Sequence, residues 1–173
     1  MIPDRLAIMT FLVRICAKVR ILSLASQRII FKTPAKDWYF IVMYRIFISH
    51  SWTYSKEYDK IEEFLKEQGV SFYNHSVPKD DPVHTNGTDK ELYEKIDAKV
   101  RGCSCVIILA GVYASYSKWI NKEIEIAKKY NKPIIAVEPF GSERTSKVVK
   151  EAATVIVGWR AYSVANAVKT YAL

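Results

Sequence analysis

The chain has 173 residues, of which 50% are hydrophobic and 25% charged, a composition typical of one ordinary globular domain. Its three cysteines are too few for a disulfide framework, and its six glycines and six prolines exclude a fibrous or low-complexity protein. The formal net charge of +8 raises the question of nucleic-acid binding.

Much of this charge lies in the first part of the chain. Residues 1–42 contain seven Lys and Arg against two Asp, a net +5, which leaves +3 for the remaining 131 residues. Because the rest of the chain is nearly balanced and has no basic stripe along one element, we expect no nucleic-acid partner.

Residues 1–42 also differ from the rest in their apolar pattern. Their longest apolar run, Leu6–Val13, is eight residues, whereas a membrane-spanning helix needs roughly 20. Met43 directly precedes a strong strand pattern. We therefore expect a basic N-terminal extension over 1–42, either upstream chain or a loosely attached helix, and a domain over 43–173. A basic helix lying on a membrane surface is the alternative for the extension.

Apolar and amphipathic stretches alternate along the domain. Short apolar runs predict buried strands, and apolar residues at helical spacing predict helices. The expected strands are Tyr44–Ser49, Val70–Tyr73, Cys103–Ala110, Pro133–Val137 and Thr154–Val157. The expected helices are 55–68, the segment from the Thr88 capping box to Arg101, Lys118–Tyr130, Ser142–Glu151 and Tyr162–Tyr171.

This order predicts an α/β fold with a doubly wound, five-stranded parallel sheet and helices on both faces. The expected strand order is the flavodoxin-like 2-1-3-4-5. Ligands of such sheets bind beyond the carboxyl ends of the strands, beside the first and third strands. The segments expected at that edge are 49–55, 75–87 and 111–119.

The turn after the first strand excludes several nucleotide-binding classes. It reads Ser49-His50-Ser51-Trp52-Thr53 and has no glycine, which excludes a Rossmann dehydrogenase and a P-loop. A phosphoacceptor receiver needs acidic residues after the first strand and an aspartate ending the third, and neither is present. A flavin phosphate could not be wrapped closely without glycine.

We expect no metal site. The loop residues His75, Asp80, Asp81 and His84 match no compact metal-binding spacing, so a solvated loop is the simpler interpretation. Cys103 and Cys105 lie in an apolar run and are expected to be packing residues.

The helix that begins near residue 118 carries the most interesting chemistry. Trp119 and Glu123 are four residues apart and share one helical face. Glu123 is then an acid on an apolar surface, near a helix start at the ligand edge. Burial raises the pKa of such a carboxyl and the helix N-terminus lowers it. The alternative is a surface glutamate paired with Lys122 or Lys128, with Trp119 as a packing residue.

Five motifs in this order together resemble a TIR-type domain, and more closely the TIR-like family that includes the sensor of the Thoeris anti-phage system. The motifs are Tyr44–Trp52, Asn74–His84, Cys105–Tyr113, Ser117–Glu125 and Lys132–Val137. The resemblance spans about 44–160, nearly the whole domain, and leaves 1–42 unexplained.

The resemblance implies a signalling enzyme of prokaryotic defence that cleaves NAD at the nicotinamide–ribose bond. Such an NAD glycohydrolase or cyclase releases ADP-ribose or a cyclic ADP-ribose-type signal. The resemblance gives the catalytic role to Glu123, the glutamate that follows a tryptophan by four. It gives substrate-binding roles to Ser49, His50 and Trp119. For His50 and Trp119 a purely structural role is the alternative.

NAD is then a substrate, and no cofactor is expected. The expected partners are NAD, an effector protein reached through the nucleotide signal, and further copies of the chain. The expected location is the cytoplasm, without a membrane partner. A non-catalytic TIR-like interaction module that acts by oligomerisation is the alternative function.

Overall fold

The computed structural model describes residues 27–32, 38–49, 55–76, 88–111, 118–138 and 146–172. The chain divides into two compact units, Met1–Met43 and Tyr44–Leu173. In the first unit, β1 (Gln27–Lys32) pairs antiparallel with the first half of β2 (Trp38–Ser49). The described part of the expected extension is therefore strand and not helix. Its separation from the domain at residue 42 stays a prediction.

The second unit contains an all-parallel sheet, as predicted. The second half of β2 pairs with β3 (Phe72–Asn74) on one side and with β4 (Cys105–Leu109) on the other. Next to β4 follow β5 (Ile134–Glu138) and then β6 (Val155–Gly158). The order β3-β2-β4-β5-β6 is the flavodoxin-like order 2-1-3-4-5.

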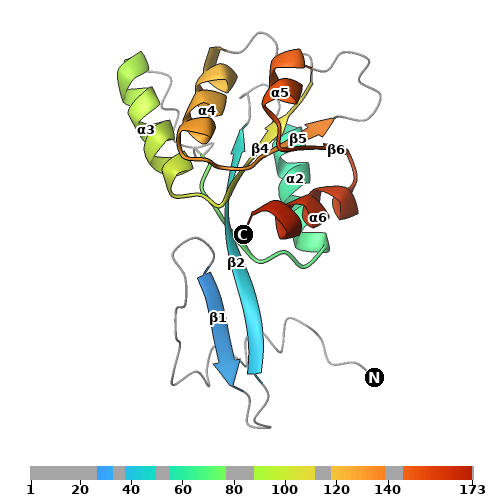
Figure 1. Ribbon diagram of the computed structural model, residues 1–173. Coiled ribbons are helices and arrows are strands. Elements are labelled where there is room, and N and C mark those ends of the chain that lie inside the picture. Colours follow the sequence, from blue (N-terminus) through green and yellow to red (C-terminus); the bar gives the residue numbers. More distant parts are fainter. Residues whose placement is uncertain are drawn as a thin grey trace. The chain divides into compact units, whose positions relative to one another are not determined.

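Helices cover both faces of this sheet (Figure 1). On one face lie α3 (Asp89–Arg101), α4 (Lys118–Lys129) and α5 (Lys147–Ala152), whose apolar side chains share a buried cluster with the sheet. On the other face α2 (Ser55–Glu67) packs against α6 (Ala161–Tyr171). The ring of Phe64 meets that of Trp159 edge-on at 5.4 Å between centroids.

The ends of two helices explain where the strands begin. Gly69 has φ 64° and follows α2, and the Val70 amide donates to the Leu65 carbonyl at 2.9 Å. This is the Schellman closure, which needs a left-handed residue. Because Val70 closes the helix, the strand predicted from Val70 starts only at Phe72. Asn131, with φ 51°, ends α4 in the same way.

The capping box predicted at the start of α3 is present. The Thr88 hydroxyl accepts from the Glu91 amide at 3.3 Å, and the Thr88 amide donates to the Glu91 carboxylate at 2.9 Å. Both bonds use groups that a bare helix terminus leaves without partners.

Thr88→Ala is expected to lower the free energy of unfolding by about 1 kcal/mol, because the orphan amide of Glu91 loses its acceptor. In a chain of this size that change lowers the thermal midpoint by roughly 2–4 °C. Thermal denaturation followed by circular dichroism measures it, with Thr88→Ser as the control that keeps the hydroxyl. An unchanged midpoint in Thr88→Ala would show that the cap contributes nothing.

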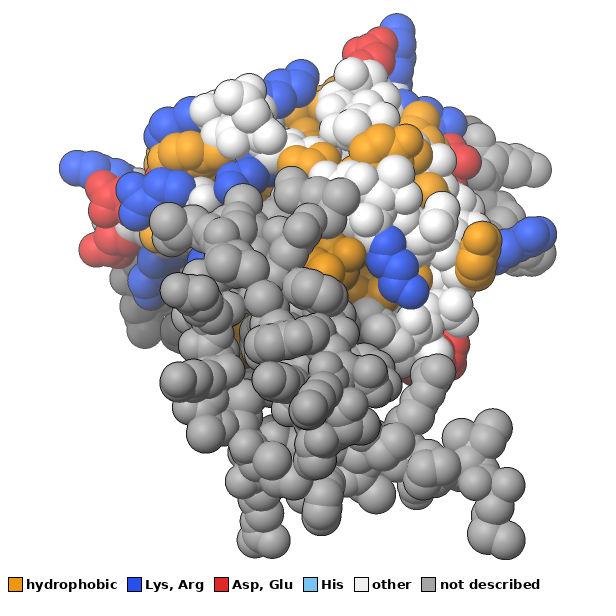
Figure 2. Space-filling model, turned by 60° about the horizontal axis from the view of Figure 1, so that its bottom comes forward, with side chains coloured by type: hydrophobic (Ala, Val, Ile, Leu, Met, Phe, Trp, Pro, Cys, Tyr) orange, Lys and Arg blue, Asp and Glu red, His pale blue; other side chains and the backbone are white. Residues whose placement is uncertain are grey.

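Basic residues gather in the last turns of the helices. They include Lys66, Lys99, Arg101, Lys128, Lys129 and Lys169. Figure 2 shows Lys and Arg side chains spread around the described part of one face, with acidic side chains beside some of them. Cations at helix C-termini are stabilised by the helix dipole, which accounts for these positions.

Two further predictions concern packing and membranes. Cys103 and Cys105 are both buried free thiols, so they are packing residues as predicted. Burial raises the pKa of the Cys103 thiol to about 12, which leaves it protonated and unreactive at neutral pH.

Within the described segments, no helix has the length and apolar character needed to cross a membrane.

Candidate active site

The carboxyl end of β2 places a serine at the expected ligand edge. Ser49 is the last residue of the strand, lies opposite Ile108 of β4 and is only 3% exposed. The amide of the preceding Ile48 donates to the hydroxyl of Ser76 at 2.8 Å. Ser49 therefore lies at the end of the first strand of the domain and next to the third strand. Parallel sheets of this order bind ligands at that place.

Glu123 meets this serine from the neighbouring helix. It lies in the second turn of α4 between the buried Ile120 and Ile124, and it is itself 7% exposed. The Ser49 hydroxyl donates a hydrogen bond to Glu123 Oε2. Lys122 pairs instead with Glu125, Nζ to Oε2 at 3.3 Å. Because Glu123 is buried, the alternative of a surface glutamate paired with Lys122 or Lys128 is wrong.

Burial dominates the electrostatics of this carboxyl. It raises the pKa of Glu123 from 4.5 to about 7, and the hydrogen bond from Ser49 opposes that rise. Near neutral pH the folded protein therefore holds Glu123 in comparable amounts of its neutral and ionised forms. A cation brought next to this carboxyl would favour the ionised form and lower its pKa.

The roles of the other two predicted substrate-binding residues stay predictions. Trp119 is partly buried and packs against the cluster between α3, α4 and the sheet. This contact agrees with the alternative in which Trp119 is a packing residue, and its substrate role stays a prediction. His50 lies outside the described residues, so its role also stays a prediction.

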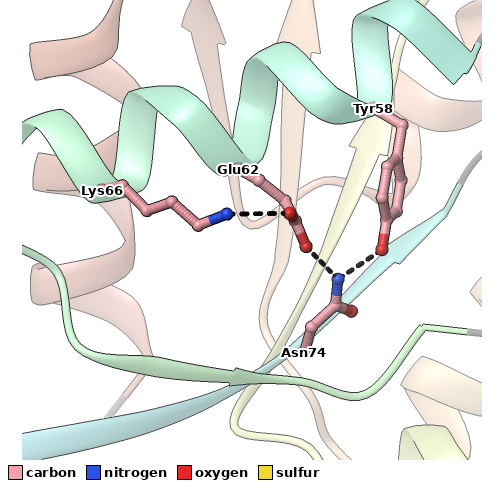
Figure 3. Close-up of polar contacts among 4 residues, drawn as sticks. All are labelled: Tyr58, Glu62, Lys66 and Asn74. Carbon is pink, nitrogen blue, oxygen red and sulfur yellow. Dashed lines mark hydrogen bonds and ion pairs between the residues drawn. The ribbon is translucent and has the colours of Figure 1, made fainter.

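Sequence reasoning missed the residues that hold the end of β2. Asn74 Oδ1 accepts from the Ser76 amide at 2.8 Å, and Ser76 in turn accepts from the Ile48 amide. Figure 3 shows the Asn74 amide nitrogen donating to the Tyr58 hydroxyl and the Glu62 carboxylate of α2. The signal was present, because an Asn two residues before its partner is typical of an Asx turn.

The loop weighed as a metal site lies largely outside the described residues, so the expected absence of a metal stays a prediction. Asp80, Asp81 and His84 lie outside the described residues. Burial, together with the charges of Arg45 and Lys99, lowers the pKa of His75. Across the segments that the structure describes, no three His, Cys, Asp or Glu side chains are grouped to hold a metal ion.

The fold and the pair Ser49–Glu123 define a flavodoxin-like α/β domain. Its buried glutamate lies at the edge of the sheet where the parallel strands end. A family model described as "Thoeris protein ThsB, TIR-like domain" matches residues 47–144. The chain belongs to this family. The resemblance to the Thoeris TIR-like family is thereby confirmed.

Comparison with other proteins adds likenesses at the level of fold. No curated protein matches the chain. A CMP N-glycosidase, BcmB, of Clostridium botulinum is similar over 73% of this chain and 99% of its own, with 17% identity and a TM-score of 0.47. A 3-dehydroquinate dehydratase-like protein of Bifidobacterium longum is similar over 75% of this chain and 94% of its own, with 14% identity and a TM-score of 0.41. At these values neither likeness says anything about activity.

Proposed function

We propose that this protein cleaves NAD at the nicotinamide–ribose bond and releases ADP-ribose or a cyclic ADP-ribose-type signal in anti-phage defence. The observation that carries the proposal is the buried Glu123, held by Ser49 at the carboxyl edge of the sheet. Membership of the Thoeris TIR-like family supports the same activity. NAD is the substrate, and no cofactor takes part.

The chemistry needs little more than a placed negative charge. Nicotinamide leaves as a neutral molecule that takes the electron pair of the broken C–N bond, so no acid has to protonate it. The ribose is left as an oxocarbenium-like cation, as in glycoside cleavage. An ionised Glu123 beside C1′ stabilises that cation, and it does so strongly because the site is shielded from water.

The acceptor decides the product. Water attacking C1′ gives ADP-ribose and releases a proton, whereas a nucleophilic atom of the same nucleotide gives a cyclic product. A cyclic product is the signal that would reach a separate effector protein. Further copies of this chain are proposed as partners, because TIR-type NAD-cleaving enzymes often complete their site by self-association.

Incubation of NAD with the purified full chain tests the proposal. Chromatography would follow nicotinamide, ADP-ribose and cyclic products over a range of protein concentrations, with and without lysate of infected cells. Release of equal amounts of nicotinamide and an ADP-ribose product supports the proposal. Intact NAD under all these conditions would contradict it and would favour the interaction module.

The activity is expected to rise with pH through about 7, because the ionised form of Glu123 stabilises the cation and its pKa is raised to about 7. Below that value kcat/KM should fall about tenfold for each pH unit, as the protonated fraction grows. Initial rates of nicotinamide release at subsaturating NAD would measure this profile. A flat profile between about pH 5 and 8 would show that Glu123 does not titrate in the reaction.

A further inference from the structure

Ser49 is immobilised from both its backbone and its side chain. Ser49 pairs with Ile108 in the sheet, and the amide of the preceding residue, Ile48, donates to the Ser76 hydroxyl at 2.8 Å. Its own hydroxyl, 3% exposed with the rest of the residue, donates to Glu123. Little bulk water therefore reaches this contact.

A serine hydroxyl has only one proton to donate. In this structure that proton is directed to Glu123 Oε2, so it is not available as a donor to a nucleotide. The carboxylate that receives it is buried, which makes the bond stronger than it would be in water. This arrangement differs from the substrate-binding role that the family resemblance implies for Ser49.

We propose that Ser49 is a positioning residue for Glu123: its hydroxyl holds Oε2 and leaves Oε1 to face the reacting ribose. The proposal rests on the proposed function for its catalytic consequence only. The contact between the two side chains is independent of what the protein turns over.

A second layer of contacts keeps the serine in place. Asn74 binds the Ser76 amide at 2.8 Å, and Ser76 binds the Ile48 amide, so the turn after β3 holds the end of β2. The Asn74 side chain is itself tied to α2 through Glu62, whose other oxygen pairs with Lys66 at 3.1 Å (Figure 3). These bonds connect α2 and β3 to the position of Ser49.

Two variants separate the hydroxyl from the bulk of the side chain. Ser49→Ala removes the donor, while Ser49→Thr keeps it at a strand position that suits a β-branched residue. The titration of Glu123 would be followed by NMR of glutamate labelled with ¹³C at the carboxyl, with the signal assigned by its loss in Glu123→Gln. Ser104→Ala is the matched control, since Ser104 is also buried but accepts from the Arg45 amide at 3.1 Å.

In Ser49→Ala the Glu123 titration should move upward by about one pH unit, because a donor to the ionised form is lost. The rising limb of kcat/KM for NAD should move with it, so that the rate near pH 6 falls about tenfold. The KM for NAD should change less than about threefold, because the serine does not bind the nucleotide. Ser49→Thr should restore the wild-type values, and Ser104→Ala should leave the titration in place.

Two results would overturn the positioning role. One is an unchanged Glu123 titration in a folded Ser49→Ala. The other is a tenfold rise in KM with kcat unchanged, which indicates direct nucleotide binding. If NAD is not turned over at all, the NMR titration still decides the matter. A moved titration without turnover would refute the proposed function and keep the role of Ser49.

Discussion

Glu123→Gln is expected to reduce nicotinamide release from NAD by a factor of about 100 or more. The amide keeps the size of the side chain and an oxygen that accepts from Ser49, but it cannot carry the negative charge that stabilises the ribose cation. Losses of this order follow removal of one group that stabilises transition-state charge. Chromatographic measurement of nicotinamide under single-turnover and steady-state conditions would separate loss of chemistry from loss of binding.

Glu125→Gln provides a matched control for this experiment. It is the same substitution on the same helix, but Glu125 is exposed and, among the described residues, pairs with Lys122. We expect its activity to stay within about twofold of the wild type, since a surface ion pair contributes little. Equal activity of Glu123→Gln and wild type would reject Glu123 as the catalytic residue.

Glu123→Gln is also expected to raise the stability of the folded protein relative to the wild type at high pH. The folded state raises the pKa of Glu123 from 4.5 to about 7, so between these values the folded protein holds a proton that the unfolded chain has lost. The wild type therefore loses stability as pH rises through this window. The glutamine does not titrate and escapes the loss, which amounts to about 3 kcal/mol once pH exceeds 7.

Thermal denaturation of both proteins from about pH 5 to pH 8 measures this difference. We expect the thermal midpoint of Glu123→Gln, relative to that of the wild type, to rise by roughly 5–10 °C between pH 5 and pH 8. This follows because each kcal/mol of stability corresponds to about 2–4 °C. Other titrating groups contribute equally to both proteins and cancel. A constant difference between the two midpoints would mean that Glu123 keeps an ordinary pKa and is not buried in solution.

From Tyr44 onward, the local signals in the sequence were sufficient for the helices and strands and their order along the chain. The capping box predicted at Thr88 is present in the structure, and the helix expected over 55–68 is α2, Ser55–Glu67. Both rely on contacts within a few residues, which sequence spacing reports directly. The β1–β2 pairing, which extends to Met43, was not predicted, because residues 1–42 are expected to form an extension outside the domain.

For the candidate site, the sequence by itself determined that Glu123 lies on an apolar helix face at the ligand edge of an α/β sheet. Helical spacing reports which face is buried, but it left open whether Glu123 was inside or paired with Lys122. Only the tertiary structure decided that, and it brought Ser49 to Glu123 across 74 residues of chain. A pairing at that separation depends on strand order and register, which many distant contacts set together and no local pattern of residues reports.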